Sequence, residues 1–152
     1  MAESQHELLD RRAIRLEVHA ADKVDAVRRC GQALVDVGAV DPAYVESMLE
    51  RERTVSTYMG EGVAIPHGTL AGKDAVHRDA LSFLRFPDGV DWDGFPVTVC
   101  IGIAATGDRH LDILAELAQI LLEPEQADQL RAATEPETVL ALLQPSRQDA
   151  KA

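Results

Sequence analysis

Two of the five histidines occupy positions where an imidazole could do chemistry. His67 stands between Pro66 and Gly68 in the stretch GVAIPHGT, at the end of a short apolar run. Proline fixes its own φ and biases the preceding residue toward extended backbone, so the chain that presents His67 is stiff. His110 follows the loop ATGDRH and begins a segment with helical periodicity. The N–H groups at a helix N-terminus favour an anion, so this second imidazole stands where a phosphate could bind.

Such a pair of imidazoles could carry a phosphoryl group. A neutral imidazole has a nucleophilic nitrogen, and its reference pKa of ~6.5 leaves it mostly neutral near pH 7. A second ring, that of His110, could then hydrogen-bond to the phosphoryl oxygens. Arg51, at the end of the helical segment that leads into the His67 stretch, could neutralise the developing charge with paired N–H donors. Spacing alone does not bring these residues together, so their meeting is a hypothesis.

Other roles for the same residues stay open at this point. His67 could simply hydrogen-bond a loop carbonyl. Together with His110, Asp108 and Asp112 it could hold a metal ion, but the chain has no HxxxH or HxH spacing. It also has no glycine-rich phosphate loop and no GxSxG elbow, so a phosphoryl donor would be another protein or a small molecule. We therefore expect neither a metal nor a cofactor.

The remaining candidates for chemistry are weak. His6 lies in the N-terminal tail, His19 ends a predicted strand and His77 lies in a polar stretch, so these three are predicted to be surface residues. Cys30 and Cys100 lie far apart in apolar contexts, where a free cysteine usually behaves as a small buried hydrophobe. Neither cysteine is expected to be catalytic.

The composition is that of a globular protein. The chain has 152 residues, which suits one domain over residues 1–152, with a core at about 8–143 between polar tails. Its net charge of −11 argues against a nucleic-acid partner, because phosphate backbones reward clustered Lys and Arg. No apolar run approaches the ~20 residues of a membrane span, and the N-terminus lacks the apolar core of a signal peptide. A cytoplasmic location without membrane insertion is therefore expected.

Hydrophobic periodicity gives an α/β pattern in which two helices follow the first strand and the remaining helices follow a strand-rich middle. We expect Pro87-Asp88-Gly89 to form a turn. In the strand at residues 97–104, one face should be lined by Val97, Val99, Ile101 and Ile103. The other face should let a helix pack closely through the small residues Thr98, Cys100 and Gly102. This order predicts an α/β sandwich with a mixed sheet between helix layers. Strands are predicted at residues 14–18, 63–65, 79–86 and 97–104. The first helix is predicted to follow Asp22 and to end at Gly38, and the second to begin at Pro42 with Asp41 as its N-cap. Three more helices are predicted: from about 110 to 123, from Pro124 to about 133, and from Pro136 to 143 with Thr134 as the cap.

Three segments carry a resemblance to a known family: MLERERTVSTYMGEGVAIPHGT from Met48, FLRFPDGVDWDG from Phe83, and IGIAATGDRHLDILAELAQIL from Ile101. The chain resembles the enzyme IIA domain of the bacterial phosphoenolpyruvate-dependent sugar phosphotransferase system (PTS), in the mannitol/fructose family, over about residues 8–143. The second and third segments look more like the mannitol branch than the fructose branch or the nitrogen-related regulatory relative. Asp91 departs from the pattern, because mannitol-type relatives are expected to have a basic residue there.

The resemblance implies a fold, a reaction and a set of partners. The implied fold is an α/β sandwich with a mixed sheet, and the implied role is that of a soluble phosphoryl carrier for uptake of mannitol or a related polyol or hexose. His67 would take a phosphoryl group from the phosphocarrier HPr and pass it to a cysteine of the enzyme IIB/IIC sugar permease. His110 would contact the phosphoryl group, Arg51 would stabilise its charge, and Glu61 would lie in the surrounding shell. The alternative is a regulatory protein of the nitrogen-related PTS that signals through its phosphorylation state.

Phosphohistidine must be shielded from water and still be reached by two proteins. For this reason we expect His67 at a rigid strand end in a shallow groove, with Val63 and Leu70 on its rim. HPr and enzyme IIB would use overlapping surfaces in small, short-lived encounters.

Overall fold

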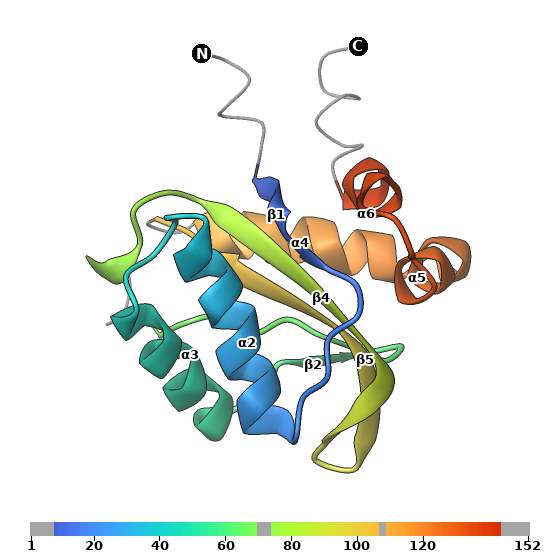
Figure 1. The fold of residues 1–152 in the computed structure, drawn as a ribbon, viewed down its shortest axis with the longest axis horizontal. Coiled ribbons are helices and arrows are strands. Elements are labelled where there is room, and N and C mark those ends of the chain that lie inside the picture. The colour runs from blue at the N-terminus through green and yellow to red at the C-terminus, as the bar shows by residue number, and fades with distance from the viewer. Residues whose placement is uncertain (1–7, 70–73, 107–108, 144–152) are drawn as a thin grey trace.

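A computed structural model describes residues 8–69, 74–106 and 109–143, without the side chains of Arg109 and His110. Its strands form one five-stranded sheet in the order β1-β4-β5-β3-β2 (Figure 1). The pairs β1–β4 and β3–β5 are parallel, whereas β4–β5 and β2–β3 are antiparallel, so the sheet is mixed as predicted. The elements in chain order are β1 (Leu9–Arg15), α2 (Lys23–Asp36), α3 (Ala43–Thr54), β2 (Tyr58–Gly60), β3 (Val63–Ala64), β4 (Ala80–Trp92), β5 (Phe95–Ala104), α4 (Arg109–Leu121), α5 (Pro124–Arg131) and α6 (Pro136–Leu143).

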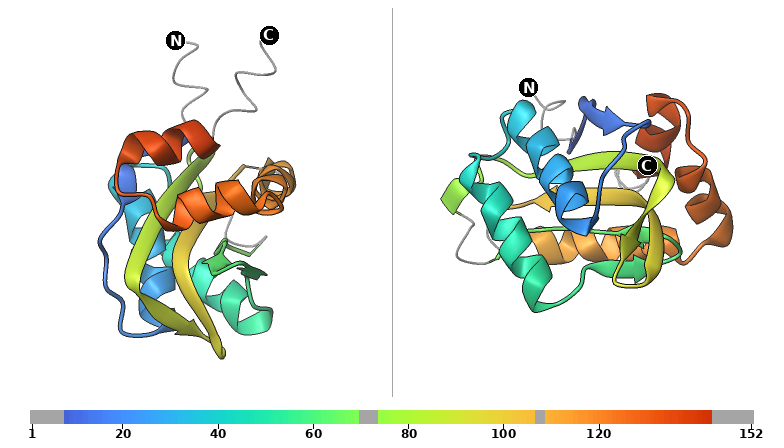
Figure 2. Two further views of the ribbon diagram at one scale, coloured as in Figure 1. Left: turned by 90° about the vertical axis from the view of Figure 1, so that its right-hand side faces the viewer. Right: turned by 60° about the horizontal axis from the view of Figure 1, so that its bottom comes forward.

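Helices cover both faces of this sheet, which confirms the predicted sandwich. Helices α2 and α3 lie on one face, with α4 on the other and α5 and α6 beside it (Figures 1 and 2). Each face has its own hydrophobic cluster. One contains Leu34, Met48 and Trp92 with Cys100 of β5, and the other contains Leu117 and Leu130 with Ile101 of β5 among their neighbours. Because side chains of a strand alternate between its faces, β5 contributes to both clusters.

The central strand packs against α2 through its small residues, as expected. A Cβ added at Gly102 would lie 3.0 Å from Sγ of Cys30 and 3.5 Å from Cδ1 of Leu34, both on α2. The prediction for the other face holds for Val99, Ile101 and Ile103. It is wrong for Val97, which belongs to the α2–α3 cluster. Val97 lies beyond the register shift between β4 and β5. Such a shift increases the local twist of the hairpin, so the side chain of Val97 packs on the opposite side of the sheet from that of Val99.

The predicted turn at Pro87-Asp88-Gly89 is wrong. These residues lie inside β4, at the register shift between Arg85 and Val90, and proline is tolerated at such a bulge. The chain reverses instead between Trp92 and Phe95, at Asp93-Gly94, where φ is 55° and 100°. Two residues with positive φ form the tight turn that suits the twist of a hairpin, and Asp-Gly is a preferred pair for it.

Asp91 stabilises this hairpin turn. Its Oδ1 accepts a hydrogen bond from the amide of Gly94 at 3.0 Å. The acid that departs from the family pattern therefore has a local structural partner.

The first strand begins earlier than predicted and ends earlier. Strand β1 spans Leu9–Arg15, so Leu9 and Asp10 belong to the sheet, and residues 16–18 lie outside the strand. Leu9 is 2% exposed, and Ala13 and Ile14 are both buried, which breaks the alternation on which the prediction depended. A register shift between Leu9 and Ile14 against β4 allows these two neighbours to be buried together.

The helix starts agree with the predictions to within a residue. Asp22 is the N-cap of α2, and its side chain accepts from the amide of Asp25. Helix α3 begins one residue later than predicted, with Pro42 at the N-cap position, while the Asp41 carboxylate pairs with His77. In α4, Ile113, Leu117 and Leu121 are buried, whereas Leu111 in the first turn is 59% exposed.

Candidate functional site

His67 extends the parallel ladder between β3 and β5. Val63 pairs with Val99 and Ala64 with Cys100, and His67 continues the same register opposite Ile103. The amide of Ile103 donates to the carbonyl of Pro66 at 3.0 Å. The backbone of the predicted nucleophile is thus joined to the central strand of the sheet, which confirms that it stands at a strand end.

One hydrogen bond fixes the tautomer of the imidazole. Nδ1 of His67 lies 2.9 Å from the carbonyl oxygen of Ile65. A carbonyl oxygen only accepts, so Nδ1 carries the proton in this bond and the lone pair of the neutral ring lies on Nε2. The ring therefore has one nucleophilic nitrogen, in a fixed orientation.

His67 is more enclosed than the sequence suggested. It is 8% exposed, so access to the ring is narrow rather than that of a shallow groove. Val63 does not form a rim, because it is fully buried in the cluster beneath α4. Leu70 lies outside the described residues.

Helix α3 holds the two residues that follow His67. The hydroxyl of Tyr44 accepts from the amide of Gly68 at 2.9 Å, and Oγ of Ser47 accepts from the amide of Thr69 at 2.7 Å. Tyr44 and Ser47 are three residues apart, so they lie on the same face of the helix. Neither residue could be identified from the sequence, because nothing in its local pattern shows which distant backbone it meets.

The glycine after His67 is required by this helix. A Cβ at Gly68 would lie 2.5 Å from Cε1 of Tyr44 and 2.8 Å from Oγ of Ser47. Real Cβ atoms do not approach other atoms so closely, and both neighbours are held by hydrogen bonds. The space that glycine leaves is therefore filled by α3.

A buried carboxylate, also missed from the sequence, braces the other end of the segment. Glu52 is 5% exposed, and its Oε2 accepts from the amide of Thr57 and from Nε1 of Trp92, each at 3.0 Å. Its Oε1 accepts from the hydroxyl of Thr57. The carbonyl of Thr57 in turn accepts from the amide of Ile65 at 3.0 Å. Glu52 thus links α3 and β4 to the residue whose carbonyl orients His67.

Arg51 lies one helical turn beyond Ser47, on the α3 face that meets the His67 segment. It is half-buried, and its Nη1 donates to the carbonyl of Val55 at 2.9 Å, just past the end of the helix. A guanidinium has five N–H donors, so this single bond leaves further donors for an anion. This placement is compatible with the charge-stabilising role proposed for Arg51.

Glu61 lies in the turn of the β2–β3 hairpin, and its described contacts are not with His67. It is the first residue of the two-residue turn between β2 and β3, with φ of 57°, followed by Gly62 with φ of 76°. Its carbonyl accepts from Nη1 of Arg131 at 2.6 Å, and its carboxylate lies 3.7 Å from the same nitrogen. The described contacts of Glu61 thus join the hairpin to α5.

His110 belongs to the first turn of α4, as predicted, but its side chain lies outside the described part of the structure. The pairing of His67 with His110 therefore stays a prediction. Thr106, shortly after the end of β5, is anchored by Asp79, whose Oδ1 accepts from the amide and the hydroxyl of Thr106 at 2.7 and 3.0 Å. Asp79 is a further residue that local sequence patterns did not reveal.

The metal alternative gains no support from the described residues. Asp108 and the His110 side chain lie outside them, and no group of three His, Cys, Asp or Glu side chains within them could hold a metal ion.

The other candidate side chains have structural or surface roles. His19 pairs with Asp88 and His77 with Asp41, each at 2.8 Å on the surface, as predicted; His6 lies outside the described residues. Cys30 and Cys100 are both free and fully buried. Burial raises the pKa of the Cys100 thiol well above its ordinary value, and the neighbouring Cys30 adds to this, so Cys100 is not a ready nucleophile.

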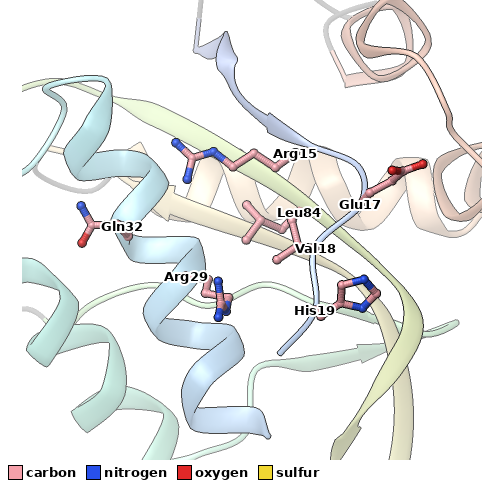
Figure 3. A pocket seen from close by; sticks show the side chains of 7 residues that line it. All are labelled: Arg15, Glu17, Val18, His19, Arg29, Gln32 and Leu84. Atoms are coloured by element: carbon pink, nitrogen blue, oxygen red, sulfur yellow. The ribbon is translucent and has the colours of Figure 1, made fainter. Parts of the chain in front are cut away.

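A separate hollow lies between the end of β1 and α2 (Figure 3). Arg15, Arg29 and His19 line it, which suggests an anion site at first sight. Each of them already has a carboxylate partner: Asp36 for Arg15, Asp25 for Arg29 and Asp88 for His19. The hollow is therefore an ion-paired surface, and the His67 segment is the stronger candidate site.

The fold and the site together define an α/β sandwich that presents one oriented imidazole at a strand end, a class of protein suited to carrying a group on histidine. The family described as "Phosphoenolpyruvate-dependent sugar phosphotransferase system, EIIA 2" matches residues 7–145. The chain belongs to this family and is a phosphotransferase component of that system.

Curated relatives and solved structures agree with this assignment. The mannitol-specific phosphotransferase enzyme IIA component of Staphylococcus aureus is 43% identical over 133 residues, covering 88% of this chain and 92% of the relative. That of Halalkalibacterium halodurans is 43% identical over 136 residues, covering 90% and 94%. The crystal structure of IIA mannitol from Escherichia coli superimposes with a TM-score of 0.81 at 36% identity, covering 88% of this chain and 97% of that one. Within the described part of the chain, no helix is both long and apolar enough to cross a bilayer.

Proposed function

We propose that this protein carries a phosphoryl group on Nε2 of His67 during mannitol uptake. It accepts the group from phosphorylated HPr and passes it to a cysteine of the enzyme IIB component of a sugar permease, in the cytoplasm. The observation that carries the proposal is the hydrogen bond between Nδ1 of His67 and the carbonyl of Ile65, because it leaves the nucleophilic lone pair on Nε2.

The reaction has two displacements at phosphorus. The Nε2 lone pair forms a bond to phosphorus as the bond between phosphorus and the donor breaks. The proton on Nδ1 stays in place, and the Ile65 carbonyl stabilises the positive charge that the ring gains. In the second step the thiolate of the IIB cysteine forms a bond to phosphorus, the N–P bond breaks, and the electron pair returns to Nε2.

Side chains chiefly stabilise the negative charge of the phosphoryl group. The amides of Gly68 and Thr69 donate to Tyr44 and Ser47, so they are not directed at a phosphoryl group. In the proposed reaction Arg51 supplies a guanidinium, and His110 donates a hydrogen bond from the first turn of α4. Glu61 acts at a distance, by holding the β2–β3 hairpin to Arg131.

The named relatives support mannitol as the sugar and enzyme IIB as the acceptor. Two relatives at 43% identity are mannitol-specific enzyme IIA components. A solved complex of Escherichia coli enzyme IIA mannitol with phosphorylated enzyme IIB mannitol superimposes with a TM-score of 0.82 at 35% identity, covering 90% of this chain and 98% of that one. The nitrogen regulatory protein IIA-Ntr of Neisseria meningitidis is less similar, at 29% identity with a TM-score of 0.79, so the regulatory alternative is not favoured.

The direct test is phosphorylation of the purified chain by phospho-HPr, followed by transfer to a mannitol enzyme IIB. We expect acid-labile, base-stable phosphate on the wild type, and a phosphorus NMR signal of phosphate on Nε2. His67→Gln should accept none. His77→Gln is the matched control, because His77 is exposed and paired with Asp41. Phosphate retained on His67→Gln, or found on Nδ1 of the wild type, would refute the assignment.

The same assay tests the second histidine. His110→Ala should fold but transfer more slowly, by about 30- to 1,000-fold, because it loses a hydrogen bond that strengthens in the transition state. Unchanged kinetics would remove His110 from the site.

A further inference from the structure

We propose that Tyr44 is a positioning residue for phosphoryl transfer, because its hydroxyl forms a bridge in the ladder that carries His67. The inference rests on the proposed role of His67 as the phosphorylated residue. It adds a residue that the family assignment and the names of the relatives do not provide.

The bridge lies at one rung of the parallel pairing between the His67 segment and β5. In a parallel ladder, the residue opposite His67 bonds to the carbonyl before the histidine and to the amide after it. The first of these bonds is regular, from the amide of Ile103 to the carbonyl of Pro66 at 3.0 Å. At the second, the Tyr44 hydroxyl accepts from the amide of Gly68 at 2.9 Å and donates to the carbonyl of Ile103 at 2.8 Å.

This arrangement ties the peptide that follows His67 to both the helix and the sheet. The Tyr44 ring fills the space beside Gly68, where an added Cβ would lie 2.5 Å from Cε1 and 2.8 Å from Cζ. The hydroxyl therefore sets how far the chain stands from Ile103 as it leaves the sheet. That spacing, with the bond from Nδ1 to Ile65, fixes where Nε2 points.

Tyr44 acts through His67 and has little surface for a partner to contact. It is 4% exposed, and its hydroxyl already has a partner on each side. Burial raises the pKa of Tyr44 above its ordinary value, so the hydroxyl keeps its proton and its donor role at neutral pH. An effect of its removal on transfer should therefore appear in the rate of the chemical step and not in partner affinity.

Tyr44→Phe removes the bridge and leaves the ring in place. The amide of Gly68 and the carbonyl of Ile103 then either close into a direct bond or take up a water, and both outcomes move the peptide after His67. A misplacement of about 1 Å can cost up to ~100-fold in rate. Because Ser47 still holds Thr69, we expect a smaller loss, of about tenfold.

The experiment measures phosphorylation of full-length Tyr44→Phe by phospho-HPr over a range of donor concentrations. We expect the rate at saturating donor to fall about tenfold with an unchanged half-saturating concentration. Nitrogen NMR of the His67 ring should show a smaller fraction of the Nδ1–H tautomer. Tyr58→Phe is the chemical control, and Ser82→Ala is the burial control, because its fully buried hydroxyl donates to the carbonyl of Cys30. Both controls should transfer at the wild-type rate.

The outcomes separate this inference from the function on which it rests. A wild-type protein that accepts no phosphate ends the proposed function. Two outcomes overturn the role of Tyr44 alone, provided that the wild type accepts phosphate. In the first, Tyr44→Phe transfers at the wild-type rate. In the second, only its half-saturating donor concentration rises. If Tyr44→Phe does not fold, a ring-fluorinated tyrosine at position 44 changes the hydroxyl bonds without removing them, and an unchanged transfer rate there overturns the inference.

Discussion

The buried carboxylate of Glu52 offers the sharpest test of how the site is held. Its two oxygens accept from the amide and hydroxyl of Thr57 and from Nε1 of fully buried Trp92. Glu52→Ala leaves these donors without their acceptor and opens a cavity. Since an unpaired buried donor costs ~1–3 kcal/mol and the backbone amide and the indole cannot turn elsewhere, we expect a loss of about 4 kcal/mol in the free energy of unfolding.

Glu52→Gln separates hydrogen bonding from charge. The amide oxygen can stand where Oε2 accepts from Trp92 and from the Thr57 amide. The amide nitrogen can then donate to the Thr57 hydroxyl, which turns from donor to acceptor. Every polar group keeps a partner, so we expect this variant to lose only about 1 kcal/mol, the difference between a charged and a neutral acceptor.

The assay is equilibrium unfolding in urea, with m-values compared to confirm that each variant unfolds as one unit. Glu50→Ala is the matched control, because Glu50 lies on the same helix and is exposed; it should change stability by less than about 0.5 kcal/mol. Phosphoryl transfer should slow in folded Glu52→Ala, since the Thr57 carbonyl positions Ile65. If Glu52→Ala costs no more than the Glu50 control, the described network does not brace the site and the reasoning is wrong.

Two further predictions concern thiol reactivity and acid stability. Native protein should resist iodoacetamide at pH 8, with both cysteines labelled only after unfolding, because both thiols are fully buried and burial also raises the pKa of the Cys100 thiol. Mass spectrometry measures this, and rapid native labelling would contradict it. Unfolding midpoints in urea should fall as the pH drops below about 4. The hydrogen bond from Arg15 lowers the pKa of Asp36, and the hydrogen bond from the amide of Ala21 lowers the pKa of Asp25. The two carboxylates therefore stabilise the folded state fully above their unfolded pKa of ~3.9. This stabilisation is lost as the pH falls through their lower folded pKa values. Asp36→Asn should flatten this dependence, and a midpoint that stays constant to pH 3 would show that these pairs contribute nothing.

The sequence predicted those parts of the fold that local physics controls. Periodicity placed α2 and its end at Gly38, whose φ is 76°, and the apolar run of β5 identified the central strand. The stretch around Pro66 correctly indicated that His67 stands at a strand end. In each case the signal lies within one element, so neighbouring residues are sufficient to read it.

The predictions from sequence were wrong where two candidate turns competed, or where the register between strands decides which residues are paired and buried. Pro87-Asp88-Gly89 has turn chemistry, but the more compact Asp93-Gly94 turn, four residues later, is the one that closes the hairpin. In β1 the alternation after Ile14 suggested a strand, yet pairing with β4 begins at Leu9. A single strand does not carry its register, because the partner strand sets it.

The site residues likewise divide into those that their own stretch of sequence indicates and those that depend on a distant part of the fold. His67 could be proposed from its own stretch, but Tyr44, Ser47 and Glu52 could not, since each is defined by the groups it reaches across the fold. On its own, Glu52 looks like one more acid in a helix of mixed charges. Only the packing of α3 against the segment from Thr57 to Thr69 shows that it is buried and has three donors.

This packing also bears on how the proposed phosphoryl group on His67 would be stabilised. A loop that binds phosphate through its backbone directs successive amides at the anion. Here the amides of Gly68 and Thr69 are held by α3 instead, and the carbonyl of Ile65 orients the ring. The backbone therefore sets the position and the tautomer, and charge must come from groups brought in from outside the loop. Without a helix packed as α3 is here, a Pro-His-Gly tripeptide would lack that division of roles.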